Sequence, residues 1–156
     1  MSDCCEMNQE KTSSLKENQK ACPVNSIKGK PVQLITLKSL LKPRALEQLN
    51  PETSYRFCAS SDCSVVYYSE TGQTFTTNNL KVPVFHKDSR ETTPACYCFG
   101  WTRQRIAQEI KQFGESSAVA SITAHVQAKR CGCEVNNPQG KCCLSEVKTV
   151  VQEWNG

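Results

Sequence analysis

The first half of the chain changes from a polar segment to an alternation of short apolar runs. Residues 1–21 are rich in Ser, Glu, Asn and Lys and show no apolar periodicity, which predicts a flexible tail. An apolar stretch and then spaced leucines suit one or two short helices interrupted at Pro43. Two β-prone runs, Tyr55–Cys58 and Val65–Tyr68, and a threonine-rich run after a Thr-Gly turn predict strands. The pattern therefore predicts a small α+β module over residues 22–85.

The second half carries the longer apolar period of helices. A polar segment at residues 86–95, with a proline near its end, predicts a linker. Apolar positions three and four apart then predict three helices within a module of residues 96–156. The first should be capped by Thr102 and end at Gly114, the second follows a serine pair, and the third lies between residues 142 and 154. The expected fold class is α+β, a small mixed module followed by a helical one.

The number of cysteines indicates which kind of chemistry the chain supports. The chain has 156 residues, of which 11 are cysteine and only 38% are hydrophobic, so packing alone does not account for the thiols. Its start shows no apolar run behind basic residues, and no stretch reaches the roughly 18 apolar residues of a membrane span. We therefore expect a cytoplasmic protein without membrane insertion, in a reducing compartment where disulfides are rare. Metal ligation is the main interpretation left for the cysteines.

Six cysteines of the second module form three close pairs. They are Cys96-x-Cys98, Cys131-Gly-Cys133 and Cys142-Cys143. A [2Fe–2S] cluster needs four thiolates, two on each iron, and a helix hairpin between the first pair and the later ones would return the chain to its starting point. The spacing therefore predicts a [2Fe–2S] site that uses the first pair and two of the later cysteines, and it leaves open which two.

The first module offers a second metal site. Cys58 and Cys63 form a Cys-x4-Cys loop between two predicted strands, and Cys22 is the natural third ligand of a Zn²⁺ ion. We prefer a structural zinc, with buried reduced cysteines and no metal as the alternative. The fourth ligand is open among water and four side chains: Cys4, Cys5, Asp62 and His86.

Metal binding should remove most of the formal net charge of +4. It counts every cysteine as neutral, whereas ligating cysteines are thiolates. Four thiolates on a [2Fe–2S]²⁺ core and four on a Zn²⁺ ion bring the holoprotein close to neutral. The lysines and arginines are also scattered among acids along the chain. We therefore expect no nucleic-acid binding.

The ordered cysteine pattern resembles a known family. The Cys-Tyr-Cys-Phe-Gly-Trp run, the later Cys-Gly-Cys, the Asn137–Gly140 loop and the Cys-Cys pair resemble the N-terminal domain of the CopZ copper chaperones. That domain pairs a zinc site with a [2Fe–2S] cluster, and its second half is similar to the helical module of bacterioferritin-associated ferredoxins (BFD). The resemblance covers about residues 22–151, although Asn25 stands where the family often has a cysteine after Cys-Pro. It implies the cluster ligands Cys96, Cys98, Cys133 and Cys143, with Cys131 and Cys142 as alternates.

The function that the resemblance implies is metal homeostasis, with copper as the expected metal. The chain would be a metallochaperone-like or redox accessory and no enzyme, apart from a one-electron reduction of Cu(II) by its cluster. The alternative is a ferredoxin-like electron carrier with no copper role. The family's Met-x-Cys-x-x-Cys copper loop does not occur in the sequence, so a heavy-metal-associated protein or a metal transporter is the expected partner. Cys4 and Cys5 are a candidate soft-metal site that could hold Cu(I) transiently.

Overall fold

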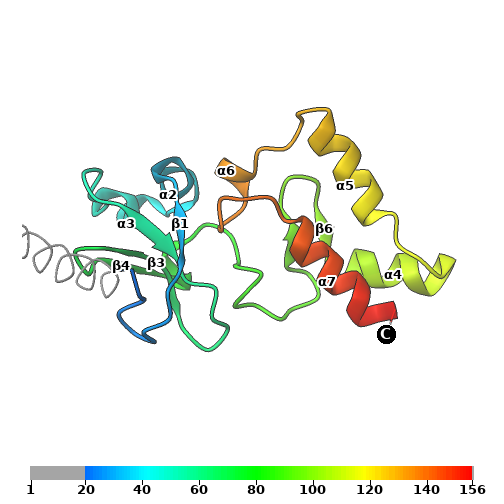
Figure 1. The fold of residues 1–156 in the computed structure, drawn as a ribbon, viewed down its shortest axis with the longest axis horizontal. Coiled ribbons are helices and arrows are strands. Elements are labelled where there is room, and N and C mark those ends of the chain that lie inside the picture. The colour runs from blue at the N-terminus through cyan, green and yellow to red at the C-terminus, as the bar shows by residue number, and fades with distance from the viewer. Residues whose placement is uncertain (1–19, 156) are drawn as a thin grey trace, which may run out of the picture.

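The computed structural model describes residues 20–155, which form two lobes (Figure 1). The β lobe, residues 20–84, contains a four-stranded antiparallel sheet with the strand order β1-β2-β3-β4. Its elements are β1 (Lys30–Val32), α2 (Leu34–Leu40), α3 (Pro43–Glu47), β2 (Tyr55–Phe57), β3 (Val65–Ser69), β4 (Thr74–Thr76) and the 3₁₀ turn η1 (Thr77–Asn79). The interruption expected at Pro43 is present, because this proline is the first residue of α3.

Strand β3 is buried along its whole length because both of its faces are covered. Val66 and Tyr67 pack in the core beneath α2, together with Leu37 and Phe57. Val65 and Tyr68 pack instead against a group of buried cysteines, and a register shift between Val65 and Tyr67 lies in the pairing with β4. The sequence of the strand is therefore a continuous apolar run rather than an alternation of apolar and polar residues.

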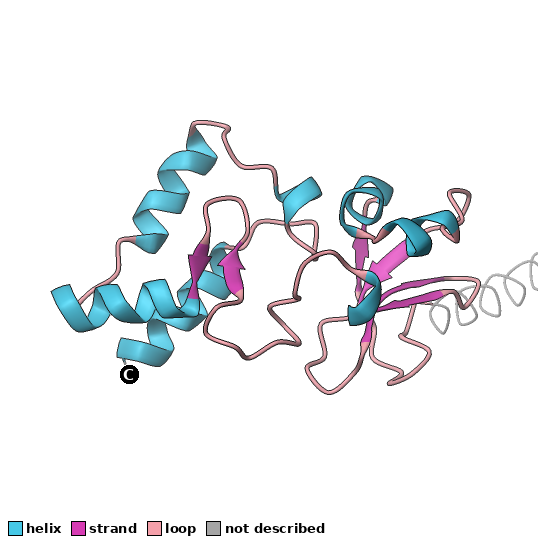
Figure 2. Cartoon of the chain, turned by 180° about the vertical axis from the view of Figure 1, so that it is seen from behind, coloured by secondary structure: helices cyan, strands magenta, loops and turns pink. Residues whose placement is uncertain are grey.

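The helical lobe, residues 94–155, begins with a short hairpin and continues as helices (Figure 2). Its elements are β5 (Pro94–Cys96), β6 (Trp101–Thr102), α4 (Arg103–Phe113), α5 (Ala118–Gln127), α6 (Cys133–Asn136) and α7 (Leu144–Asn155). The buried faces of α4, α5 and α7 meet around Ile106, Ile122 and Val147. The α+β fold class is confirmed, and no helix of residues 20–155 is long and apolar enough to cross a membrane.

The ends of α4 follow the sequence signals. The hydroxyl of Thr102 accepts a hydrogen bond of 3.0 Å from the backbone N–H of Arg105, which caps the first turn. Gly114 ends the helix in a left-handed conformation with φ 82°. The helix therefore begins at Arg103, directly after its cap Thr102, and ends at Gly114 as the sequence predicts.

The segment predicted as a linker is bonded to both lobes. Lys87 donates to backbone carbonyls of the β lobe, whereas the guanidinium of Arg103, on α4, donates to the carbonyl oxygen of Asp88 at 2.8 Å. A second link is made by the loop after α6, because the hydroxyl of Tyr67 donates to the carbonyl oxygen of Pro138 at 2.5 Å. The two lobes are therefore joined at several points.

Candidate metal centres

Three cysteines from distant parts of the β lobe meet beside β3. Cys22 lies near the start of the described chain, and Cys58 and Cys63 flank the loop between β2 and β3. Their sulfur atoms all lie within 4.8 Å of one another, and the three residues are 1%, 2% and 5% exposed. The sulfurs of Cys22 and Cys63 are 3.9 Å apart, which fits the spacing of about 3.8 Å that two Zn–S bonds of 2.3 Å impose at a tetrahedral ion.

Polar groups around this three-cysteine site stabilise the thiolate form of Cys58. Burial would raise the pKa of Cys58, but the backbone of Ser60, the Lys87 ammonium and the Asn25 amide outweigh it and lower that pKa. The Asn25 amide donates to the Cys58 sulfur at 3.5 Å, and Lys87 Nζ lies 3.8 Å from the same atom. These donors favour a thiolate at Cys58, whereas burial and the neighbouring cysteines raise the pKa of Cys63.

The described residues bring no fourth side chain into this group. Asp62 and His86 were expected as candidates, and neither belongs to the cluster of ligand atoms within 4.8 Å. The His86 ring packs edge-on against Phe57 and lies 3.2 Å from a carboxylate oxygen of Glu146. The other two candidates, Cys4 and Cys5, lie outside the described residues, as does the soft-metal site predicted for them.

A second group of cysteines lies where the hairpin of the helical lobe meets α6 and α7. Cys96 ends β5, Cys98 is in the turn after it, Cys133 begins α6 and Cys143 precedes α7. Cys96 and Cys143 are each 1% exposed, and the other two are half-buried. The sulfurs of Cys98 and Cys133 lie 3.6 Å apart, although the residues are 35 positions apart in the chain.

The pKa values of the four thiols in this second group are shifted in opposite directions. Hydrogen bonding to Cys143 lowers the pKa of Cys96 to about 7 and that of Cys133 to about 6. The same contacts, with burial, raise the pKa of Cys143. Burial also raises the pKa of Cys98 to about 11. The thiolate form, which binds metals, is therefore favoured at Cys96 and Cys133 and disfavoured at Cys98 and Cys143 while no metal is bound.

The sulfurs of this second group are less closely gathered than those of the three-cysteine site. Among residues 20–155, no three ligand atoms other than those of the three-cysteine site lie within 4.8 Å of one another. A single tetrahedral ion would hold its thiolates about 3.8 Å apart, whereas a two-iron cluster is held by two pairs of thiolates. Backbone and side-chain donors also reach Cys98, since the N–H of Gly132 is 3.3 Å and the amide of Asn136 is 3.7 Å from its sulfur.

Burial separates one pair of alternative ligands and not the other. Cys142 is exposed and Cys143 is buried, whereas Cys131 and Cys133 are both half-buried. The loop from Asn137 to Gly140 turns the chain back between the two pairs, with an internal bond of 2.8 Å from Gly140 N–H to the Asn137 carbonyl oxygen. Cys142 is thus placed at the surface and Cys143 in the core of the helical lobe.

Comparison with known proteins agrees with the zinc-type site. Residues 19–81 match the family model of a zinc-binding domain of the CopZ type. A CopZ-like zinc-binding domain occupies this part of the chain. The chain is 32% identical over 122 residues to the copper chaperone CopZ of Archaeoglobus fulgidus, a match that covers 78% of this chain and 57% of that protein. It therefore spans little more than half the length of this curated relative.

The fold agrees as well. The X-ray structure of the Archaeoglobus fulgidus CopZ N-terminal domain superposes with a TM-score of 0.68 at 27% identity, and covers 83% of this chain and 96% of that structure. The predicted resemblance is thereby confirmed for the CopZ-like zinc-binding part, and the ferredoxin-like character of the second half stays a prediction.

Sequence reasoning missed two participants in the three-cysteine site. Lys87 lies in a polar segment where no spacing marks it. Asn25 was noted only as the residue in place of a cysteine, yet its amide still contacts the Cys58 sulfur. The Cys-Pro-x-Asn pattern was therefore the signal that could have placed Asn25 in the site.

Proposed function

We propose that this chain is a metal-binding protein of copper homeostasis that carries a structural zinc ion and a [2Fe–2S] cluster. The observation that supports it best is the presence of two separate cysteine groups in a CopZ-like chain, one with three sulfurs within 4.8 Å of one another and one that contains the Cys98–Cys133 contact. The compact group would bind zinc through Cys22, Cys58 and Cys63. The group in the helical lobe would bind the cluster through Cys96, Cys98, Cys133 and Cys143.

The zinc ion would be structural in this proposal. Its three ligands are almost fully buried and lie against Tyr68 of the central strand, so the ion would tie the chain start and the β2–β3 loop to the sheet. No cysteine of residues 20–155 is in a disulfide, which fits the reducing cytoplasm that we propose as the compartment.

The helical lobe would serve electron transfer. A bound [2Fe–2S] cluster accepts and releases one electron at a time. The chain's own residues would hold four thiolates in two pairs, donate hydrogen bonds to Cys98 and exclude water with the core around Trp101 and Ile106. Copper would be the cargo, reduced from Cu(II) to Cu(I) and passed to a heavy-metal-associated protein or a transporter.

Metal analysis tests both sites in one measurement. After anaerobic purification we expect about one zinc, two iron and two acid-labile sulfide ions per chain. Cys143→Ser should lose iron and sulfide and keep zinc, because it removes a buried ligand of the helical lobe only. Cys142→Ser is the matched control and should keep all three.

A chain without sulfide, or one in which Cys142→Ser and not Cys143→Ser loses the cluster, would contradict this ligand assignment. The copper role is tested separately by titration with Cu(I) under anaerobic conditions. Tight binding beyond the zinc and iron content supports it, whereas its absence leaves an electron carrier without copper. The Cys4→Ser/Cys5→Ser double variant then tests whether the first residues supply the copper ligands.

A further inference from the structure

A cavity of about 420 Å³ lies where the two lobes meet. Its walls come from the start of β1, from the end of β2 with the following loop, and from the loop before α7. Phe57, Cys58 and Ala59 form part of one wall, and Gln139, Cys142 and Ser145 form part of the other. The volume is in the range of small-molecule sites, which is about 300–1,000 Å³.

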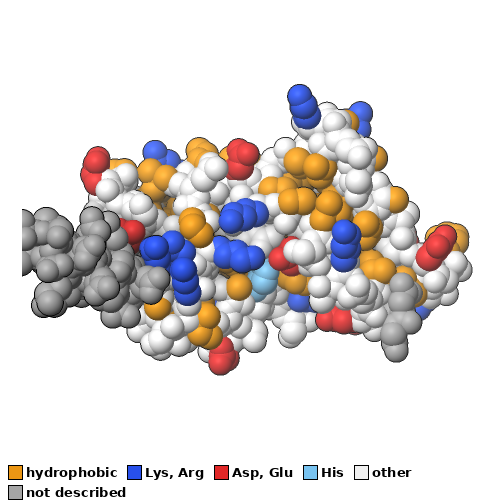
Figure 3. Space-filling view, viewed as in Figure 1, with side chains coloured by type: hydrophobic (Ala, Val, Ile, Leu, Met, Phe, Trp, Pro, Cys, Tyr) orange, Lys and Arg blue, Asp and Glu red, His pale blue; other side chains and the backbone are white. Residues whose placement is uncertain are grey.

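The rim of this cavity is cationic. Lys28, Lys30 and Lys141 line it, all three are exposed, and none forms an ion pair within residues 20–155. The acid of the lining, Glu146, is bonded to His86 at 3.2 Å and to the amide of Gln139 at 3.1 Å. Figure 3 shows basic side chains, and one acidic one, beside a histidine in the middle of the face that it draws. The cavity therefore presents free ammonium groups to an incoming anion.

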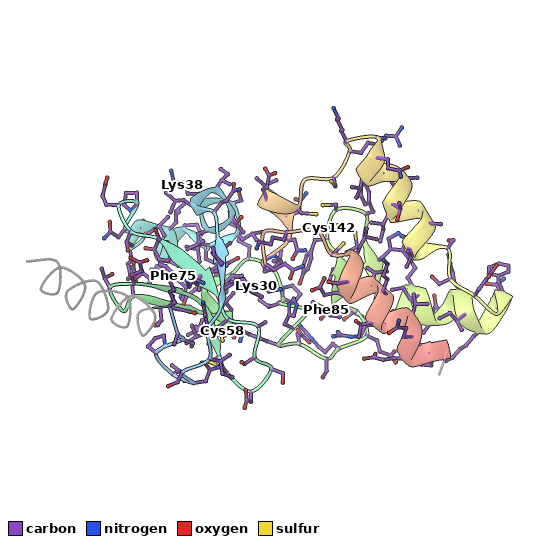
Figure 4. All side chains as sticks on the ribbon, viewed as in Figure 1. Lys30, Lys38, Cys58, Phe75, Phe85 and Cys142 are labelled. Carbon is purple, nitrogen blue, oxygen red and sulfur yellow. The ribbon has the colours of Figure 1, made fainter. Side chains whose placement is uncertain are left out.

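An exposed thiol stands in the same rim. Cys142 lines the cavity from the helical lobe and Lys30 lines it from the β lobe, and Figure 4 labels both at the junction of the lobes. Cys142 precedes the buried Cys143, so it is the surface member of the pair and is not needed as one of the four proposed cluster ligands. Lysines and a thiol at one small cavity match a ligand that carries both carboxylates and sulfur.

We propose that this cavity recognises small carboxylated thiols and their anionic soft-metal complexes, and that Cys142 is the sulfur that exchanges with them. The lysines bind the carboxylates by charge-assisted hydrogen bonds, which places the carrier's sulfur at Cys142. A tripeptide thiol such as glutathione has this chemistry, since it carries more carboxylates than ammonium groups.

The exchange with a metal complex balances without a redox step. Consider a Cu(I) ion that is bound by the thiolates of two small carrier molecules. One bond between copper and a carrier sulfur breaks, and a bond between copper and the Cys142 sulfur forms. The proton of Cys142 goes to the departing thiolate, and the copper stays Cu(I). This metal part of the inference rests on the copper function proposed above, whereas the recognition of carboxylated thiols does not.

Disulfide trapping tests the recognition directly. The holoprotein is incubated with glutathione disulfide, which is anionic, or with cystamine, which is cationic, and the modified cysteine is located by peptide mass spectrometry. The Cys142 thiolate attacks the reagent, the reagent's S–S bond breaks, a mixed disulfide forms and the other half leaves as a thiol. We expect Cys142 to react about tenfold faster with the anionic reagent at low salt, and this preference to shrink as salt is added.

Charge variants of the rim provide the decisive comparison. Lys30→Gln/Lys141→Gln should lower the rate with glutathione disulfide about fivefold to tenfold and leave the rate with cystamine unchanged or faster. Lys38→Gln is the matched control, because Lys38 is an exposed lysine of α2 outside the cavity. The visible absorption of the cluster and the zinc content check that each variant is folded. Equal rates with the two reagents, no reaction at Cys142, or an unchanged preference in the double variant would each overturn the proposal.

Copper uptake separates this inference from the proposed function. Cu(I) is offered as its glutathione complex to the parent, to Lys30→Gln/Lys141→Gln and to Cys142→Ser. Slower uptake in both variants supports the metal part of the inference. Equal uptake in all three overturns the metal part and leaves the copper function standing. If no copper is taken up from any donor, the copper function and the metal part both fail. The recognition of carboxylated thiols is then decided by the charge preference of Cys142 alone.

Discussion

The ammonium of Lys87 donates to the carbonyl oxygens of Ser60 and Cys63 at 2.6 and 2.7 Å, and lies 3.8 Å from the Cys58 sulfur. One cation thus fixes the loop between two proposed zinc ligands and offsets negative charge on the Cys58 sulfur. Hydrogen bonds from a charged donor contribute about 1.5–3 kcal/mol each to stability, more than neutral ones do. Lys87 therefore acts as a positioning residue of the three-cysteine site.

Replacing this lysine should loosen the zinc site. Lys87→Met keeps an unbranched side chain only one atom shorter and removes the charge, so we expect zinc to be lost to a competing chelator about tenfold faster. Lys87→Arg keeps a cation that can donate to both carbonyl groups and should retain most of the affinity. The measurement is the rate of zinc transfer to a chromophoric chelator, and equal rates in the parent and Lys87→Met would refute the role.

At the scale of single residues, the proposed zinc ligands could be predicted from the sequence, whereas the polar groups around them could not. Cysteine type and spacing are visible in the sequence, and the structure brings Cys22, Cys58 and Cys63 together. Lys87 reaches the same site from a polar segment after the sheet, and only the folded path of that segment decides where its side chain ends. A short-range pattern carries no information on such a contact.

At the scale of elements, the long periodic segments could be predicted and the shortest ones could not. Helices α4, α5 and α7 have 10 to 12 residues and repeat their apolar positions over about three turns. Strands β5 and β6 have 3 and 2 residues, and α6 has 4, so none of them spans enough residues to show a period. Two of the proposed cluster ligands, Cys96 and Cys133, lie at the ends of these short elements, and Cys98 lies in the turn between β5 and β6. Spacing therefore left the choice among the cysteines open.

Gly140 shows what the loop between α6 and α7 requires. Its φ is 71°, a left-handed conformation, and a Cβ atom there would lie 2.9 Å from the Thr36 hydroxyl and 3.1 Å from a methyl group of Val32. That hydroxyl also donates to the Glu134 carbonyl oxygen at 2.6 Å. The loop can therefore lie against the β lobe only with a residue that has no side chain at this position.

Gly140→Ala should lower the stability of the protein by more than the cost of the backbone conformation alone. The left-handed conformation costs a non-glycine residue about 1–2 kcal/mol, and the contact with Thr36 adds to it, so we expect the free energy of unfolding to fall by about 2–3 kcal/mol. Gly72→Ala is the control, because Gly72 also has a positive φ, 94°, and open space around it. Its cost should stay near 1 kcal/mol. Urea unfolding of the zinc-loaded proteins measures both, and similar losses would contradict the close-contact argument.

On the scale of the whole molecule, each lobe has its own core, and the loop between Cys133 and Cys143 is shared. The core of the β lobe surrounds Leu37 and Tyr67, and that of the helical lobe surrounds Ile106 and Val147. The shared loop belongs to the helical lobe by sequence, yet it is bonded to the β lobe through the hydroxyl of Tyr67. The sequence predicts two modules, and it gives no sign of this bond between residues 71 positions apart.

A change in the β lobe should therefore disturb the proposed cluster in the other lobe. Tyr67 is fully buried, and burial raises its pKa, so the hydroxyl keeps its proton and donates to the Pro138 carbonyl oxygen. Tyr67→Phe leaves that buried carbonyl unsatisfied, at a cost of about 1–3 kcal/mol, and frees the loop that aligns two of the four proposed ligands. We expect the cluster absorbance of Tyr67→Phe to bleach severalfold faster in air, with the zinc content unchanged.

Tyr55→Phe is the matched control for this coupling. The hydroxyl of Tyr55 is also hydrogen-bonded, but its partners, Asn50 and Gln73, both belong to the β lobe. Tyr55→Phe should therefore lower the stability of the β lobe and leave the bleaching rate as in the parent. If both variants bleach faster by the same factor, the effect follows global stability rather than the bond to Pro138. Faster bleaching confined to Tyr67→Phe means that the sheet of one lobe holds a metal-binding loop of the other in place.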